Sequence, residues 1–226
     1  MRLVRTVICD IEGTTSSLDF VHHVLFPYAA RELPAFVRER GDDPAVSALL
    51  DDVRAEAGEP DADAGRIVDI LLGWIAEDRK AKPLKDLQGM IWEQGYRDGT
   101  FRGHVYADTA PAFRRWRERG ASIGIYSSGS VAAQKLLFRH SEAGDLTGFI
   151  DDWFDTSIGH KRDPESYRRI AAHVGRPADT ILFISDTAAE LDAAAEAGMR
   201  TMQMARGERV SGGRHPVVVS FDEVTI

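Results

Sequence analysis

The chain is poor in cysteine. Its 226 residues include a single cysteine, Cys9, which has no partner for an internal disulfide. A chain without internal disulfides suits a reducing compartment, so we expect a cytoplasmic location. Cys9 lies in a short apolar run, where the simplest interpretation is a small buried side chain.

Long apolar runs are absent as well. The run from Ile181 to Ile184 stops at Ser185, far short of the ~18 apolar residues that a membrane-spanning helix needs. The first five residues include two arginines and lead directly into a strand-like segment, which is not the pattern of a signal peptide. We therefore expect no membrane partner.

Basic residues are outnumbered by acidic ones. Lys and Arg total 28 against 36 Asp and Glu, which gives a net charge of −8. This balance argues against a nucleic-acid partner, because such binding depends on neutralising phosphates. A small anionic substrate is still compatible, since a metal ion or a few local donors can reverse the sign of one pocket. The composition, 43% apolar and 28% charged, is that of a globular protein.

The apolar pattern changes along the chain. A short β-branched run at 6–9 predicts a parallel strand that is buried on both faces. Roughly eighty residues with helical spacing follow; Pro27 should interrupt the first of these helices, and Pro83 should end the third. After about Phe101 helices alternate with strands, which we expect at 122–126, 149–154, 180–185, 199–204 and 217–220.

This organisation predicts an α/β fold. A doubly wound, Rossmann-like and mostly parallel sheet, with a helical cap inserted after the first strand, explains it best. We expect a core domain formed by residues 1–18 and 102–226 and a cap domain formed by residues 19–101.

Polar residues gather where the predicted strands end, and ligands bind at that edge of open α/β sheets. Four clusters lie at these ends: Asp10-Ile11-Glu12-Gly13-Thr14, Ser127-Ser128-Gly129, Gly159-His160-Lys161, and Asp186 with Glu190. Asp10 and Asp186 would repel each other unless a cation lay between them, and hard oxygen ligands favour Mg²⁺.

The residue types in these clusters predict metal-assisted phosphoryl transfer. Asp10 could attack phosphorus as a nucleophile. Glu12 is placed to protonate a leaving oxygen and later to activate water. Ser127, Ser128 and the backbone N–H groups that follow them could hold phosphate oxygens. Lys161 would stabilise the nucleophile and the charge of the transition state.

Three of these clusters also have a purely structural interpretation. Asp10 and Thr14 could form a turn and a helix cap. The segment 127–130 could cap the following helix, a role that is compatible with phosphate binding. Asp186 and Glu190 have the spacing of first-turn residues that interact with a helix dipole, and this leaves the role of Glu190 open.

Three other groups of residues have ordinary interpretations. His22 and His23 lack the spacing of zinc ligands, and we interpret them as ordinary helix residues, although contact with a substrate is an alternative. His160 is interpreted as structural. The arginines at 114, 115, 117 and 119 are interpreted as a solvated helix face.

The order of the motifs resembles that of the haloacid dehalogenase superfamily, with strand-Asp-x-[Asp/Glu]-Gly-Thr, strand-Ser, a later Lys and strand-Asp. A helical insert after the first motif is where that superfamily carries its cap. Glu12 narrows the match to the enolase-phosphatases, the bifunctional family of methionine salvage, because most superfamily phosphatases have Asp there. The resemblance covers nearly the whole chain and is carried by these segments: Asp10–Thr15, Leu25–Tyr28, Tyr126–Ser130, Gln134–Phe138, Phe154-Asp155 and Ile158–Lys161.

The resemblance implies a substrate and a set of site residues. The substrate would be 2,3-diketo-5-methylthiopentyl-1-phosphate, which is enolised and then dephosphorylated to the acireductone 1,2-dihydroxy-3-keto-5-methylthiopentene. The resemblance also favours a monomer. It does not identify the base for enolisation, for which Glu12 and Asp10 are both open. The implied ligands are Asp10, Glu12 through its backbone carbonyl and Asp186 for Mg²⁺, and Ser127, Ser128 and Lys161 for the substrate phosphate.

Two other functions compete with this one. A sugar-phosphate or phosphoglycolate-type phosphatase could use the same scaffold, but Glu12 and the Gly-His sequence before Lys161 argue against it. A catalytically inactive relative could serve as a binding module, and the intact set of polar motifs argues against that.

Overall fold

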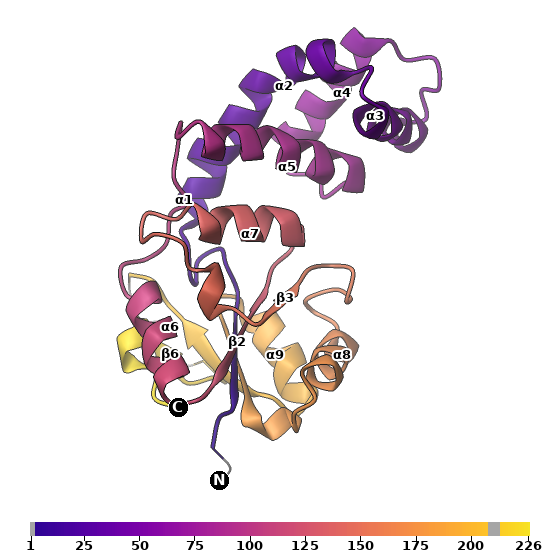
Figure 1. Ribbon diagram of the computed structural model, residues 1–226. Helices are drawn as coiled ribbons and strands as arrows, with labels where there is room; N and C mark the ends of the chain where they lie inside the picture. Colours follow the sequence, from indigo (N-terminus) through magenta and orange to yellow (C-terminus); the bar gives the residue numbers. More distant parts are fainter. Residues whose placement is uncertain (1–2, 208–212) are drawn as a thin grey trace. The chain divides into compact units, whose positions relative to one another are not determined.

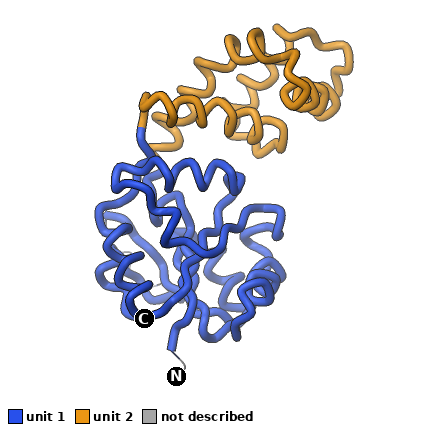
Figure 2. Tube along the Cα trace, viewed as in Figure 1, with its two compact units in different colours: residues 1–18, 102–226 blue, residues 19–101 orange. Residues whose placement is uncertain are grey.

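The chain divides into two compact units (Figure 2). The structure is a computed structural model that describes residues 3–207 and 213–226. Met1–Leu18 and Arg102–Ile226 form unit 1, and Asp19–Phe101 form unit 2. No helix within the described ranges has both the length and the apolar content that crossing a bilayer requires.

Unit 1 is built on a six-stranded parallel sheet with the strand order β3-β2-β1-β4-β5-β6. Cys9, at the end of β1, lies opposite Ile125 on one side and Ile184 on the other. Every residue of β1 and β4 is buried, as expected for strands covered on both faces. The strands are β1 (Thr6–Cys9), β2 (Ser122–Tyr126), β3 (Asp152–Phe154), β4 (Ile181–Ser185), β5 (Arg200–Met204) and β6 (Val217–Val218).

Helices cover both faces of this sheet (Figure 1). On one face, α6 (Thr109–Glu118) and α7 (Val131–Arg139) meet where the rings of Phe113 and Phe138 lie 6.2 Å apart. On the other, α8 (Pro164–Val174) and α9 (Ala188–Glu196) share a buried cluster with Phe183 of β4. This arrangement follows the strand order, which runs one way from β1 to β3 and the other way from β4 to β6. The predicted doubly wound fold is confirmed.

The helix and strand limits follow local signals in most places. Asp163 caps α8, its carboxylate accepting a hydrogen bond from the Glu165 amide at 2.9 Å, and Gly175 ends the helix with a φ of +66°. The strand expected at 149–154 is shorter, because Thr147–Phe149 forms a 3₁₀ turn, η2, before β3. Two further 3₁₀ turns are η3 (Ala178–Thr180) and η4 (Phe221–Glu223).

Unit 2 is helical, as its spacing predicts. A short helix, α1 (Leu18–Phe20), and a π-helical turn, η1 (Val21–Leu25), lead into α2. Trp92 joins the two ends of the unit, since its Nε1 donates a hydrogen bond to the carbonyl of Leu25 at 2.8 Å. The longer helices are α2 (Phe26–Arg40), α3 (Pro44–Ala57), α4 (Ala64–Ala76) and α5 (Lys82–Arg97).

Three prolines of unit 2, Pro27, Pro44 and Pro83, lie at helix starts. The helix interrupted near Pro27 changes from π to α geometry at Phe26, and Pro27 lies in the first turn of α2. The expectation that Pro83 ends the third helix is wrong, because α4 already ends at Ala76 and Pro83 lies in the first turn of α5. A first-turn proline is tolerated, since the N–H that it lacks has no partner within the helix.

Candidate active site

Two aspartates lie at the carboxyl edge of the sheet on neighbouring strands. Asp10 directly follows β1, and Asp186 directly follows β4. The Asp10 amide donates to the carbonyl of Ile184 at 2.9 Å, which extends the strand pairing up to the site. Burial raises the pKa of Asp186, and the charge of Asp10 raises it further, so the two carboxylates interact. The structure thus brings together the two residues that were expected to share a cation.

Lys161 is a buried cation at the same edge. Its Nζ lies 2.6 Å from Oδ1 of Asp10 and 2.7 Å from Oε2 of Glu190, and only 9% of its side chain is exposed. Burial by itself lowers the pKa of Lys161, but attraction to Asp10 and Glu190 outweighs burial and leaves the pKa above its ordinary value. Lys161 is therefore protonated at neutral pH and places a fixed positive charge beside Asp10.

Contacts from β2 and α8 fix the backbone around Lys161. The Tyr167 hydroxyl donates to the Lys161 carbonyl at 2.7 Å, and the Tyr126 hydroxyl donates to the Gly159 carbonyl at 3.0 Å. Gly159 has a φ of +144°, and a Cβ at this position would overlap the side chain of Ser166. A glycine is therefore required two residues before the lysine.

Glu190 belongs to this cluster, a role that the sequence left open. It is buried, and its Oε2 accepts a hydrogen bond from the Ser185 hydroxyl at 3.0 Å in addition to its pair with Lys161. Burial raises the pKa of Glu190 and so does the charge of Asp10, while Lys161 acts in the opposite direction. Its only sequence signal was an acid four residues after Asp186, and that spacing fits a helix-dipole residue equally well.

The loop after β1 closes against Asp186. Gly13 has a φ of +71°, and a Cβ at this position would overlap the Asp186 carboxylate. The Thr14 hydroxyl oxygen accepts a hydrogen bond from the Asp186 amide at 3.1 Å. Glycine supplies both the left-handed backbone and the space for this close approach.

The same loop carries Glu12, which is half-buried. Glu12 pairs with Ser16 in an isolated β-bridge, and the Thr15 hydroxyl donates to the Asp10 carbonyl at 3.0 Å. The backbone of Glu12 is therefore held in a tight turn directly beyond Asp10. The turn interpretation of this segment is correct, and it is compatible with a catalytic role.

The loop after β2 carries Ser127 and Ser128. Ser127 is buried, and its Oγ accepts a hydrogen bond from the Gly129 amide at 3.2 Å, while Ser128 is half-buried. The cap of α7 is Ser130, whose Oγ accepts from the Ala133 amide at 3.3 Å. The hydroxyl that caps the helix thus belongs to a different residue from the two predicted to bind phosphate.

Gln134 holds this loop in place from α7. Its Nε2 donates to the carbonyls of Gly129 at 2.9 Å and Phe154 at 2.8 Å, and its side chain is buried. Asp155 contributes as well, because its Oδ2 accepts from the Val131 amide at 3.2 Å. Gln134 and Asp155 lie in segments that carried the family resemblance, but their polar contacts cannot be derived from spacing.

The donor set at this edge suits a hard divalent cation. Asp10 and Asp186 offer carboxylate oxygens, and the Glu12 carbonyl lies on the loop that follows Asp10. Within residues 3–207 and 213–226 no three His, Cys, Asp or Glu side chains gather as a metal-binding group. A cation here would complete its coordination with a backbone carbonyl and water, which is the coordination that Mg²⁺ accepts readily.

His22 and His23 lie in η1 of unit 2, and both are exposed. His23 Nδ1 is 3.5 Å from Oδ1 of Asp19, and the His22 ring meets Phe26 edge-on. These local contacts are those of ordinary helix residues.

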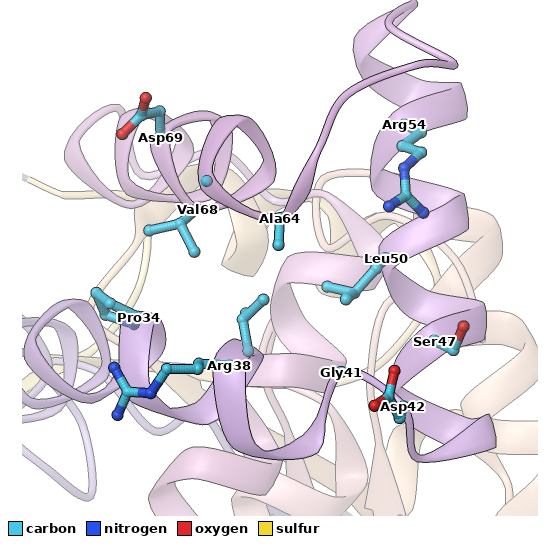
Figure 3. A pocket seen from close by; sticks show the side chains of 12 residues that line it. Pro34, Arg38, Gly41, Asp42, Ser47, Leu50, Arg54, Ala64, Val68 and Asp69 are labelled. Atoms are coloured by element: carbon cyan, nitrogen blue, oxygen red, sulfur yellow. The ribbon is translucent and has the colours of Figure 1, made fainter.

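Unit 2 has a cleft of its own, about 710 Å³ in volume, between α2, α3 and α4 (Figure 3). Leu50 and Val68 project into it. Its charged lining consists of Arg38, Arg54, Asp42 and Asp69, so the charges of the two signs balance. None of the predicted site residues lines this cleft.

The sequence matches known proteins over nearly its whole length. Residues 4–198 match the family model of haloacid dehalogenase-like hydrolases. A protein of Pseudomonas aeruginosa (strain UCBPP-PA14) named Enolase-phosphatase E1 is 56% identical over 224 residues, which cover 99% of each chain. An Enolase-phosphatase E1 of Erwinia tasmaniensis is 50% identical over 222 residues, covering 98% of this chain and 97% of that protein.

Solved structures share the fold. The crystal structure of the UTR4 protein from Saccharomyces cerevisiae matches with a TM-score of 0.84 and 33% identity, covering 98% of this chain and 100% of that one. The hydrolase YfnB from Bacillus subtilis, bound to magnesium, matches with a TM-score of 0.59 and 15% identity, covering 98% and 97%.

Proposed function

The chain belongs to the haloacid dehalogenase-like hydrolases, and within them to the enolase-phosphatase family, and we propose that it acts on 2,3-diketo-5-methylthiopentyl-1-phosphate in methionine salvage. The substrate is enolised and then dephosphorylated to the acireductone. The observation that carries the proposal is the meeting of Asp10, Asp186 and Lys161 at one edge of the sheet. This set combines a nucleophile, a second carboxylate and a fixed cation.

Asp10 is the nucleophile of the dephosphorylation step. One carboxylate oxygen forms a bond to phosphorus while the bond from phosphorus to the substrate's ester oxygen breaks. Glu12 gives its proton to the departing oxygen. It then takes a proton from the water that attacks the aspartyl phosphate, so that inorganic phosphate leaves and Asp10 is restored.

Cationic and hydrogen-bonding groups hold the phosphate during this step. Lys161 lies 2.6 Å from Asp10, so its positive charge reduces the repulsion between the Asp10 carboxylate and the substrate phosphate. Ser127, Ser128 and the N-terminal amides of α7 bind phosphate oxygens. Asp10, Asp186 and the Glu12 carbonyl would hold Mg²⁺, which when bound would reduce charge repulsion and polarise the substrate's carbonyl.

Enolisation precedes phosphate loss at the same site. A base must remove a proton from the carbon next to a carbonyl, and the carboxylates of Glu12 and Asp10 are the two candidates. Lys161 lies 2.7 Å from Glu190 and cannot take that proton, because it is protonated at neutral pH.

The test is to supply the diketo phosphate and follow enol absorbance and phosphate release together. We expect an enol species to appear before phosphate, and both signals to be lost when Mg²⁺ is removed with a chelator. Asp10→Asn should block phosphate release more than enolisation. Equal loss of both signals would show that Asp10 serves both steps.

The competing functions give different results in the same assay. Phosphate release without a preceding enol species would indicate a sugar-phosphate or phosphoglycolate-type phosphatase instead. A binding module would release no phosphate from a generic phosphate ester in the presence of Mg²⁺.

The proposal extends to the organisation of the chain. Unit 1 would be the catalytic core domain, comprising residues 1–18 and 102–226, and unit 2 the cap domain, comprising residues 19–101. We expect a cytoplasmic monomer, and size-exclusion chromatography with light scattering would test the monomeric state.

A further inference from the structure

Two polar residues at the carboxyl end of β5 contact the proposed active site from outside. Gln203 lies within β5 and Arg206 lies two residues after its end. Neither belongs to the four motifs at the strand ends, and both are half-buried. Their side chains bond to backbone atoms of the two loops that carry the proposed Mg²⁺ ligands.

Arg206 fixes the loop after β1. Its Nε and Nη2 donate to the carbonyl of Thr14 at 3.0 Å and 2.7 Å. Its Nη1 lies 2.6 Å from Oδ2 of Asp108, and only 12% of the Arg206 side chain and 10% of the Asp108 side chain are exposed. The guanidinium also lies over the rings of Tyr106, 4.0 Å from the centroid, and Phe221, 4.8 Å away. A planar group with five donors is suited to such a position, because one face stacks while the edge forms hydrogen bonds.

Gln203 fixes the loop after β4. Its Nε2 donates to the carbonyl of Asp186 at 3.0 Å, and its own amide donates to the carbonyl of Pro216 at 2.8 Å, which anchors it in the sheet. The Asp186 amide in turn donates to Thr14 Oγ1 at 3.1 Å. Gln203, Asp186, Thr14 and Arg206 therefore form one chain of contacts across both loops.

We propose that Arg206 and Gln203 are positioning residues that hold the two loops at the distance which Mg²⁺ binding requires. The inference rests on the proposed function only in that it takes Asp10 and Asp186 as metal ligands. Without these tethers, repulsion between the two carboxylates would favour separation of the loops whenever the cation is absent. Partners that orient metal ligands typically contribute 10–100-fold to metal affinity or activity.

The role is one of geometry. The Arg206 charge is paired with Asp108, and its remaining donors are bonded to a backbone carbonyl. Arg206 therefore acts on the site through Thr14. Loss of Arg206 should weaken Mg²⁺ binding and slow the reaction, with little effect on the affinity for the substrate.

The experiment compares Arg206→Met, Arg206→Lys and Gln203→Leu with the parent chain. Calorimetric titration with MgCl₂ in the absence of substrate measures the Kd of the metal, and steady-state assays give kcat and KM. We expect Arg206→Met to raise the Kd about 10-fold or more and to lower kcat by a similar factor, while KM changes less. Arg206→Lys should restore part of the loss, because one ammonium donor can still reach the Thr14 carbonyl.

Arg115→Met is the matched control. Arg115 of α6 donates to the carbonyl of Phe221 at 3.0 Å and pairs with Asp222, so it ties the same C-terminal turn without contacting either loop. An unchanged metal Kd in Arg206→Met and Gln203→Leu would overturn the proposal. An equal loss in Arg115→Met would also overturn it, since the effect would then come from the turn as a whole.

Two further outcomes are informative. If Arg206→Met does not fold, Gln203→Leu decides, because it leaves the pair between Arg206 and Asp108 intact. In the second outcome, the parent chain fails to enolise the diketo phosphate while the variants still bind Mg²⁺ more weakly than the parent. That pair of results would overturn the proposed function and support this inference. The two proposals can therefore fail separately.

Discussion

At the scale of single residues, Lys161 is the group on which we expect both catalysis and stability to depend. It is shared by two buried carboxylates, Asp10 and Glu190. Lys161→Met should lower kcat by roughly 100- to 1000-fold, the effect of losing a charge that stabilises a transition state. It should also lower the free energy of unfolding by about 3–5 kcal/mol, because two buried anions lose their partner. Enzyme assays and urea denaturation measure the two effects.

Lys135→Met serves as the control for this prediction. Lys135 lies on α7 and is exposed, and its Nζ lies 6.0 Å from the centroid of the Trp153 ring. We expect unchanged kcat and nearly unchanged stability. Wild-type activity in Lys161→Met would contradict the role assigned to the buried lysine.

Gly13 is the second single residue on which we expect the geometry of the candidate site to depend. Gly13→Ala would place a methyl group against the Asp186 carboxylate and would also strain a backbone with a φ of +71°. We expect large losses of activity and of Mg²⁺ affinity, both followed in the same calorimetric and kinetic assays. Gly58→Ala is the control, because Gly58 has a similar φ of +72° but open space around it. Equal loss of activity in both variants would attribute the effect to backbone strain alone.

At the scale of elements, α7 supports the loop after β2, the proposed phosphate-binding loop, through one side chain. Gln134→Leu removes both hydrogen bonds, to the carbonyls of Gly129 and Phe154. The half-buried Gly129 carbonyl then loses this donor, while the Phe154 carbonyl still accepts from the Ser127 amide at 3.1 Å. Each buried polar group without a partner costs about 1–3 kcal/mol. We expect a lower melting temperature and a higher KM for the phosphorylated substrate. Gln94→Leu, on the exposed face of α5, should change neither quantity.

The elements also show what local sequence can predict. The buried strands expected at 6–9 and 180–185 rest on short apolar runs, and the structure has them at Thr6–Cys9 and Ile181–Ser185. The prediction for Pro83 is wrong because proline is tolerated in the first turn of a helix but interrupts a helix interior. Which of the two applies depends on where the preceding helix ends, and no strong signal marks the end of α4 at Ala76.

At the scale of the whole molecule, Asp108 links the C-terminal segment to the rest of unit 1. Its Oδ2 accepts hydrogen bonds from the Ser220 hydroxyl and the Phe221 amide, both at 2.7 Å, in addition to its pair with Arg206. Burial raises the pKa of Asp108, but these donors outweigh burial and leave the pKa below its ordinary value. The ionised group is therefore stabilising in the folded protein.

This shift predicts how stability depends on pH. A depressed pKa contributes stability above the unfolded value of ~3.9, and that contribution is lost as pH falls through the folded pKa. The gap in unfolding free energy between wild type and Asp108→Asn should thus be constant near neutral pH and shrink below about pH 4. Urea denaturation at a series of pH values measures it. Asp42→Asn, at an exposed position, is the control.

The candidate site was predictable in outline from the sequence. The sheet topology accounts for most of this prediction. Once the parallel strands are recognised, their order places Asp10, Ser127 and Asp186 at one edge of the sheet. The individual side-chain contacts of the site could not be predicted in this way. The bond from Gln203 to a carbonyl and the choice of Glu190 as partner of Lys161 depend on three-dimensional distances that spacing does not encode.

The burial of Cys9 has a practical consequence. Its thiol is fully enclosed, and burial together with the charge of Asp10 raises the pKa of that thiol, so maleimide dyes should not react with it in the native protein. Replacing exposed Ala48 of α3 and Ala172 of α8 by cysteine would then attach one fluorophore to each unit without prior removal of the native thiol. Single-molecule energy transfer between such a pair could record how the separation of the units responds to phosphate during turnover.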